Sequence, residues 1–324
     1  MSARTFDDRP ASREKTPILV GLVGPSGSGK TFSALRLAAG FQRVTGGDTY
    51  FIDTEARRAL HYAEKFSFRH VPFGAPFSPL DYLDAINHCV KKGATTIVVD
   101  SMSHEHEGPG GVLEMHAEEH KRLGGSQGVN MLAWGKPKAA RRRMINSILQ
   151  LPINFIFCFR AKEKLKLVRG KEPEPLGFMP IAGEEFVYEM TLKCLLMPGA
   201  NGIPAWRSDM IGEKAMMKLP EQFLSTFSAN PQLSEDIGQA LATWAAGAPS
   251  APVLTAAELL SRYQACSDAA TLRTLEDARK IAWSKIAKDD KATVKAASDA
   301  AGLRVTAATF QPEDDITAAA QQGA

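Results

Sequence analysis

The chain has 324 residues, of which 44% are hydrophobic and 23% are charged, and its formal net charge is +3. This composition is that of an ordinary globular protein, and the length fits one sizeable α/β domain and a smaller one. The small net charge excludes a general attraction for polyanions, so any nucleic-acid surface must be a local patch.

The cysteine pattern disfavours a zinc-binding or disulfide-rich protein, and the lack of long apolar runs disfavours a secreted or membrane-spanning one. The four cysteines stand far apart with no C-x-x-C pair, which predicts reduced thiols in a cytoplasmic protein rather than a zinc site or a disulfide framework. The first 16 residues are polar and lack the apolar core of a signal peptide. No apolar run approaches the roughly 20 residues that a membrane span needs.

Taken in chain order, strands and helices alternate after a polar tail at residues 1–16. The expected strands are 18–23, 49–52, 69–72, 94–99 and 153–159. The expected helices are 31–43, 57–66, 80–92, 112–123 and 138–149. Residues 104–111 are expected to form a loop, the segment after 159 a mostly polar stretch to residue 180, and residues 186–197 and 203–206 a late hairpin.

The C-terminal part differs in composition. Small residues and proline at 245–252 indicate a linker, and residues 255–265, 271–287 and 291–300 predict three helices. Their expected small core consists of Leu259, Leu260, Tyr263, Leu272, Leu275, Ile281, Trp283 and Ile286. The spacing of Thr255 and Glu258 predicts a capping box. The expected division is a tail at 1–16, a core at 17–228, a helix and linker at 229–254, a helical domain at 255–305 and a tail at 306–324.

The stretch GPSGSGKT, residues 24–31, fits the phosphate-binding pattern G-x-x-x-x-G-K-[ST] and stands between an apolar strand and a helix. Glycines allow backbone N–H groups to surround a phosphate, and the positive end of the helix adds to the field. Lys30 is expected to reach the β- and γ-phosphates of ATP, and Thr31 to supply a hydroxyl to Mg²⁺. The predicted nucleotide-binding residues are Gly24, Pro25, Ser26, Gly27, Ser28, Gly29, Lys30, Thr31 and Phe32.

Two strand ends carry the acidic residues that ATP chemistry needs. The third β-branched run ends in Asp100, which is the arrangement of a Walker B carboxylate that helps to hold Mg²⁺. Ser101 follows it, so the residue that activates water must come from elsewhere. Glu55, after the second strand, is the best-placed candidate, and Glu105 and Glu107 are the alternatives.

Three polar clusters remain open to more than one interpretation. His104–Glu107 is either a metal cluster or a loop at the carboxyl edge of the sheet near nucleotide or DNA, and H-x-H alone lacks a third spaced ligand. The basic clusters at 136–143 and 162–171 either contact the phosphates of DNA or are charged faces in solvent, and one of their residues is alternatively a finger acting on a neighbouring subunit's ATP.

The strand ends FIDTEA (51–56) and IVVDSM (97–102) resemble those of RecA-type recombinases. More closely, DSMSHEHEGPGG and the later KPKAARRRMINSI and FCFRAKEK resemble phage-encoded RecA-like ATPases of single-strand annealing and recombination. The resemblance implies that Lys30 and Thr31 contact phosphate and Mg²⁺, that Glu55 is the catalytic glutamate and that Asp100 is the Walker B residue. Arg160 follows the next strand, where the family has a γ-phosphate sensor that is usually glutamine. The resemblance also implies a homo-oligomer that acts on single-stranded DNA, with a single-strand-binding or recombination protein as a possible partner.

These patterns predict an α/β fold, a RecA-like P-loop core with a mainly parallel sheet between helices and a small all-helical C-terminal domain. The leading hypothesis is a DNA-stimulated ATPase of recombination or annealing, in which Lys30, Glu55 and Arg160 act on ATP. The second is a nucleotide-switched motor or loader that acts on a protein partner. A small-molecule kinase is disfavoured by the placement of Glu55 and by the lack of a recognisable acceptor site.

Overall fold

The computed structural model describes residues 14–166, 174–206, 217–247, 254–283 and 286–309. The chain divides into two compact units, residues 1–248 and 249–324, and each is described by itself. Most of the predicted N-terminal tail and the chain beyond residue 309 lie outside the described residues. Within the described ranges, no helix has the length and apolarity that crossing a membrane requires.

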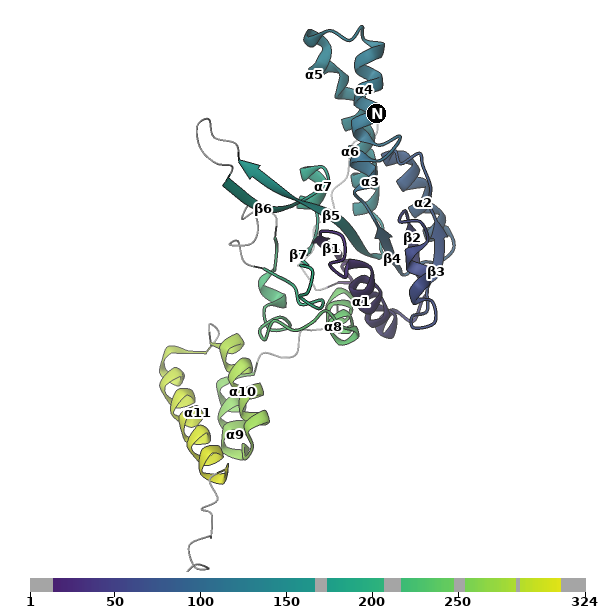
Figure 1. The fold of residues 1–324 in the computed structure, drawn as a ribbon. Helices are drawn as coiled ribbons and strands as arrows, with labels where there is room; N and C mark the ends of the chain where they lie inside the picture. Colours follow the sequence, from purple (N-terminus) through teal and green to yellow (C-terminus); the bar gives the residue numbers. More distant parts are fainter. Residues whose placement is uncertain (1–13, 167–173, 207–216, 248–253, 284–285, 310–324) are drawn as a thin grey trace, which may run out of the picture. The chain divides into compact units, whose positions relative to one another are not determined.

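The first unit is built on a seven-stranded sheet (Figure 1). Its strands are β1 (Leu19–Gly24), β2 (Thr49–Asp53), β3 (Arg69–Pro72), β4 (Thr96–Asp100), β5 (Asn154–Lys166), β6 (Glu174–Pro180) and β7 (Leu192–Leu195). Six of them run in the order β3-β2-β4-β5-β1-β7 and pair in parallel, while β6 pairs with β5 in the antiparallel sense. The predicted fold class, a parallel sheet between helices followed by C-terminal helices, is confirmed.

Helices cover both faces of this sheet because its central strands are apolar on both sides. One face packs against α1 (Lys30–Thr45) and α8 (Glu235–Ala245), and the other against α2 (Pro79–Lys91), α6 (Gly135–Leu149) and α7 (Glu184–Tyr188). The contact of α1 with α8 is close because it is made by glycines. A Cβ on Gly40 would lie 2.0 Å from the carbonyl oxygen of Glu235.

The register of the parallel strands aligns their carboxyl ends at one edge of the sheet. Asp53 of β2 lies opposite Asp100 of β4, and Gly24 of β1 lies opposite Arg160 of β5. Ligands of open α/β sheets bind outside this edge. The register thus brings together residues that are far apart in the sequence.

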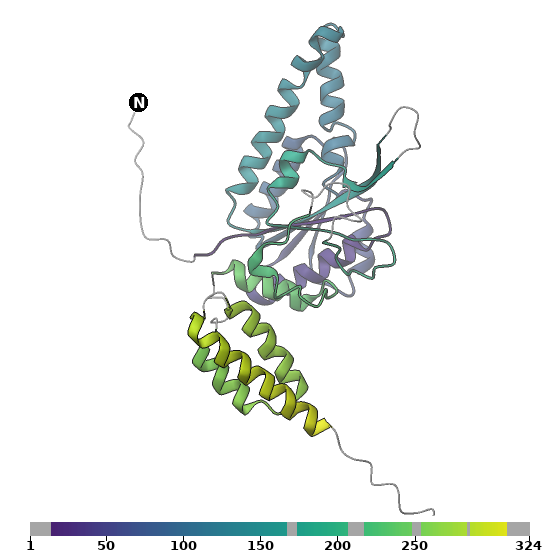
Figure 2. The same cartoon turned by 90° about the vertical axis from the view of Figure 1, so that its left-hand side faces the viewer.

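Between β4 and β5 the chain forms a helical projection, which we define as α4 (Val112–Arg122), η2 (Gln127–Val129), α5 (Asn130–Ala133) and α6. Both views show these helices extending away from the sheet, with α5 at the far end (Figures 1 and 2). The base of the projection is preceded by α3 (His104–Glu107). The prediction of a loop at 104–111 was therefore wrong in its first half, because Ser103 and the buried Glu105 anchor one helical turn there.

Three other sequence predictions need correction. Residues 57–66 contain a short 3₁₀ helix, η1 (Arg58–Tyr62), rather than a longer helix. The polar segment after residue 159 continues β5 and returns as β6, and the two strands pair antiparallel with one shift in register between Glu163 and Leu165. The predicted strand at 186–197 begins instead as α7, and its second half, β7, pairs in parallel with β1. Only the single bridge between Leu195 and Ala205 matches the expected late hairpin.

The second unit consists of α9 (Ala256–Ala265), α10 (Ala269–Ala282) and α11 (Lys288–Thr309). The capping box of Thr255 and Glu258 is present at the start of α9. The core contains Leu259, Tyr263 and Leu275, as predicted, and also Val294, Ala301 and Val305 of α11. The side chain of Ile281, which was also expected in this core, lies outside the described residues.

Candidate active site

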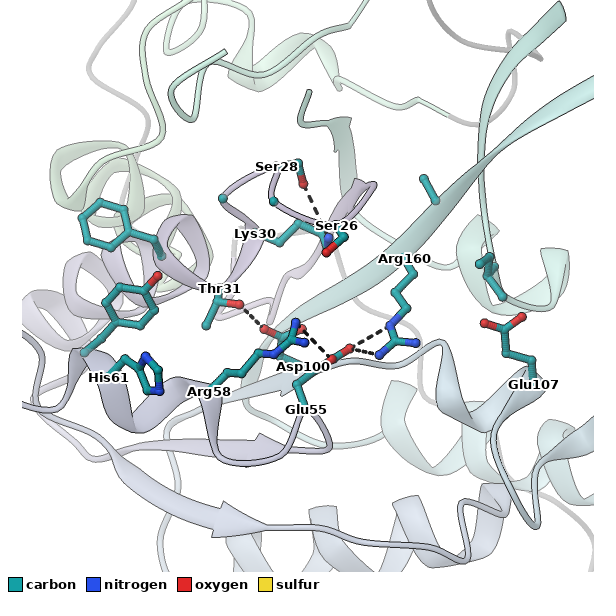
Figure 3. A pocket seen from close by; sticks show the side chains of 16 residues that line it. Ser26, Ser28, Lys30, Thr31, Glu55, Arg58, His61, Asp100, Glu107 and Arg160 are labelled. Atoms are coloured by element: carbon teal, nitrogen blue, oxygen red, sulfur yellow. Dashed lines mark hydrogen bonds and ion pairs between the residues drawn. The ribbon is translucent and has the colours of Figure 1, made fainter. Parts of the chain in front are cut away.

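The loop from Pro25 to Gly29 joins β1 to α1 and bends around an open space at the sheet edge (Figure 3). Gly27 and Gly29 have φ angles of 77° and 82°, in the left-handed region where a side chain would be strained. A Cβ on Gly24 would lie 2.4 Å from both the Ser28 hydroxyl and the carbonyl oxygen of Leu196. No side chain caps the N-terminus of α1, so the N–H groups of its first turn face this space and form an anion site.

Lys30 lies across the inside of this loop. Its ammonium donates to the carbonyl oxygens of Gly24 and Pro25 at 2.8 and 2.9 Å. Burial lowers the pKa of Lys30, although nearby acidic groups oppose this shift. The ammonium is thus held at the point where the loop and the helix N-terminus converge.

Thr31 and Asp100 form the floor of the site. The Thr31 hydroxyl donates to Asp100 Oδ2 at 2.5 Å, as drawn in Figure 3. Asp100 is 3% exposed, and burial raises the pKa of its carboxyl group to about 6. A hydroxyl and a carboxylate next to a phosphate-binding loop are the hard oxygen donors that Mg²⁺ uses, so these two residues fit the predicted metal site.

Glu55 reaches the site from the end of β2. Its Oε1 accepts a hydrogen bond from Arg160 Nε at 2.8 Å and forms an ion pair with Arg160 Nη2 at 2.7 Å, and Arg58 Nη1 lies 3.6 Å from Oε2. Asp53 holds the connection in place by accepting from the backbone N–H groups of Glu55 and Ala59. Figure 3 shows Glu55 between Asp100 and Arg160.

These groups line one pocket of about 710 Å³. Its lining residues are Ser26, Gly27, Ser28, Gly29, Lys30, Thr31, Phe32, Glu55, Arg58, His61, Tyr62, Asp100, Glu107, Arg160, Ala161 and Ile181. Most of the predicted site residues are therefore brought together. Gly24 and Pro25 are not in the lining, although their carbonyl groups hold Lys30.

The two glutamates predicted as alternative bases lie in different surroundings. Glu107 lines the pocket, whereas Glu105 is 3% exposed and points to the base of α6, where it pairs with Arg141. The prediction of Glu105 as an alternative base is wrong for this reason. Among the described residues, no cluster of three His, Cys, Asp or Glu side chains is placed to hold a metal, which leaves the metal interpretation of His104–Glu107 without support.

One wall of the pocket joins Phe32, which was predicted, to Arg58, His61 and Tyr62, which were not. Phe32 and Tyr62 pack with ring centroids 5.5 Å apart, and the ammonium of Lys65 lies 4.6 Å from the Phe32 centroid. His61 and Arg58 complete this wall from η1. Nothing in the spacing of these residues indicates a site, because the short 3₁₀ helix that turns them toward the P-loop begins after two residues with positive φ, Ala56 and Arg57.

A parallel sheet whose first strand ends in a P-loop, with a Walker B aspartate at the end of β4 and one strand, β5, between the two, defines a P-loop ATPase. The family model described as an AAA domain matches residues 16–191, more than half of the chain, so the protein belongs to this family. A KaiC-like protein from the hyperthermophilic archaeon Pyrococcus horikoshii is 16% identical over 58% of this chain and 81% of its own, with a TM-score of 0.33. A likeness at that level has no bearing on function. No curated protein matches the chain.

Proposed function

We propose that the protein hydrolyses Mg-ATP and that hydrolysis is coupled to single-stranded DNA in a phage-type annealing or recombination reaction. The observation that carries the proposal is the contact of Glu55 with Arg160 beside the P-loop. Arg160 belongs to β5, the strand that continues beyond the sheet into the β5–β6 hairpin. One side chain thus connects the hydrolytic site to a segment that extends away from it.

In this proposal the nucleotide lies along the pocket with its phosphates at the P-loop. The N–H groups of the first turn of α1 and the Lys30 ammonium hold the phosphates, and the base lies against Tyr62 and Phe32. Thr31 and Asp100 hold Mg²⁺, which neutralises charge on the phosphate oxygens when bound.

Glu55 acts as the general base. Its Oε1 is held by the Arg160 guanidinium through one hydrogen bond and one ion pair, and this guanidinium is also suited to a γ-phosphate oxygen. When Arg160 turns to the γ-phosphate, Oε1 becomes free to accept a proton from the attacking water. Glu55 and Arg160 therefore exchange partners as the nucleotide state changes.

The outer side of α6 is the surface we assign to DNA. Lys136, Lys138, Arg142 and Arg143 are exposed on it, and the helix contains no acidic residue. Lys138 and Arg142 are four positions apart, on one side of the helix, at the separation of about 5–6 Å that such pairs have. Arg141 of the predicted basic cluster is buried and does not belong to this surface. The side chains of the second cluster from residue 164 onward lie outside the described residues.

The test is ATP hydrolysis with and without single-stranded DNA across a salt series. We expect stimulation that fades as salt rises, because phosphate contacts release counterions. Replacing all four exposed cations of α6 with alanine should lower the salt slope of DNA binding by about 3, since each single-strand contact contributes about 0.7. The matched control is Lys91→Ala with Lys92→Ala, which removes two exposed cations at the end of α2.

A second function is favoured by one observation. Met131 and Leu132, on α5 at the end of the helical projection, are 76% and 69% exposed. Exposed apolar side chains at such a point suit a protein partner, as in a cytoplasmic motor or loader that assembles as a homo-oligomer. Hydrolysis that responds to a protein and not to DNA would replace the first proposal with this one.

A further inference from the structure

A buried ion pair joins the helical projection to the segment that follows the Walker B strand. Arg141, on the inner side of α6, donates from Nε and Nη2 to the two carboxylate oxygens of Glu105 at 2.9 and 2.8 Å. The two side chains are 7% and 4% exposed. Arg141 Nη2 also lies 2.9 Å from His106 Nδ1, so the guanidinium is bound to two residues of α3.

The guanidinium is enclosed on its other side as well. A Cβ on Gly183 would lie 2.2 Å from Arg141 Nη1, so the ion pair lies directly against the backbone at the start of α7. Glu185 Oε2 lies 3.9 Å from the same nitrogen. Arg141 therefore has little freedom to follow α6 without moving α3.

The turn that Arg141 holds is connected to the three segments that carry Asp100, Glu55 and Arg160. Residues 101–103 connect it to Asp100, and the hydroxyl of Ser103, its N-cap residue, accepts a hydrogen bond from the backbone N–H of Arg160 at 2.8 Å. His104 Nδ1 lies 2.7 Å from the hydroxyl of Thr54, the residue before Glu55. A shift of α3 therefore changes the positions of the Walker B residue, the base and the sensor together.

We infer that Arg141 and Glu105 form a joint through which α6 and the ATP site influence each other. Two parallel hydrogen bonds fix orientation as well as distance, so α6 and α3 move as one body. The inference rests on the proposed function, because it takes the outer face of α6 as the DNA surface. Arg141 is a positioning residue in this account and touches no nucleotide.

The variant that removes the joint is Arg141→Met with Glu105→Met. Deleting one partner alone leaves an unpaired buried charge and strongly destabilises the fold, whereas apolar residues in place of both are tolerated. The matched control is Arg36→Met with Glu235→Met, which removes another two-pronged pair in the same unit, between α1 and α8. That pair makes no contact with α3 among the interactions of the described residues.

The measurement is the dissociation constant for single-stranded DNA with a non-hydrolysable ATP analogue and with ADP. The ratio of these two dissociation constants measures the coupling between the DNA surface and the ATP site. Such coupling commonly amounts to about 5–150-fold, and we expect a ratio in this range for the wild type and the control. The joint variant should give a ratio below about twofold. An unchanged ratio in the joint variant would overturn the inference. Gly183→Ala displaces the guanidinium without altering charge and should also reduce the ratio of the two dissociation constants. This variant replaces the double variant in the test if the double variant does not fold.

Amide hydrogen exchange tests the joint independently of DNA binding, and so distinguishes an error in this inference from an error in the proposed function. In the absence of DNA, exchange of the α6 amides should differ between the ATP-analogue and ADP states of the wild type and not of the joint variant. If the wild type binds no DNA, the proposed function fails and this exchange difference alone decides on the joint. An equal difference in both proteins would refute it.

Discussion

Replacing Glu55 with glutamine tests the central chemical assignment. Glutamine keeps the size of the side chain and an oxygen that accepts from Arg160, but it cannot take a proton from water. General-base catalysis contributes about 10²–10⁴-fold, so turnover should fall by that factor, which corresponds to about 2.7–5.4 kcal/mol. ATP affinity should stay within about threefold, because the P-loop and Lys30 are untouched.

The assay is single-turnover phosphate release together with nucleotide binding by a fluorescent analogue. Glu107→Gln is the matched control, since Glu107 is the other glutamate that lines the pocket. A fall of less than about tenfold for Glu55→Gln would refute the base assignment. A large loss in Glu107→Gln at the same time would transfer the role to α3.

Four further predictions follow from particular contacts. Asp100→Asn should raise the Mg²⁺ concentration needed for half-maximal hydrolysis, because a neutral amide is a weaker ligand, and a Mg²⁺ titration measures this. Tyr62→Ala should weaken ATP binding by about 5–10-fold through loss of the aromatic wall, with no matching change in the binding of inorganic triphosphate. Gly40→Ala should lower the free energy of unfolding by about 1–3 kcal/mol in a urea titration, because its Cβ meets the backbone of α8, whereas Gly302→Ala, with open space around it, should not destabilise the protein. Burial, helped by the cations of Arg141 and Lys162, lowers the pKa of His106 to about 4, so below pH 6.5 the unfolded chain gains a proton that the folded chain does not. Stability should therefore fall from pH 6.5 toward pH 4 more steeply in the wild type than in His106→Gln, as compared by urea midpoints.

Much of the nucleotide site could be predicted because its chemistry is local. A P-loop is one continuous segment, and the strand ends at Glu55 and Asp100 point to the same sheet edge once the sheet is known to be parallel. The register places Asp53 opposite Asp100 and Gly24 opposite Arg160. This result follows from alternating strands and helices with no knowledge of side-chain packing.

The rest depended on contacts between residues distant in the sequence. In the sequence, Arg141 cannot be told from the neighbouring surface cations. Only its burial against Glu105, 36 positions earlier, shows that it forms part of the protein interior. The β5–β6 hairpin could not be predicted from the polar residues after 159, because its strands extend beyond the sheet and need no apolar face. Tyr62 belongs to a site only because η1 turns it toward Phe32.

The placement of Arg160 explains why these distant contacts matter for function. Its backbone N–H is held by Ser103, next to the turn that Arg141 fixes, while its guanidinium holds Glu55. A single residue is thus held beside α3 and contacts the carboxylate that we propose as the general base. A glutamine at this position would contact Glu55 without neutralising it, whereas an arginine both pairs with the carboxylate and is drawn to the γ-phosphate. Arg160→Gln should therefore raise hydrolysis without DNA relative to hydrolysis with DNA, because Glu55 would no longer be held by a cation. Steady-state rates measured with and without single-stranded DNA test this expectation. An equal loss of both rates would show that Arg160 serves the chemical step alone.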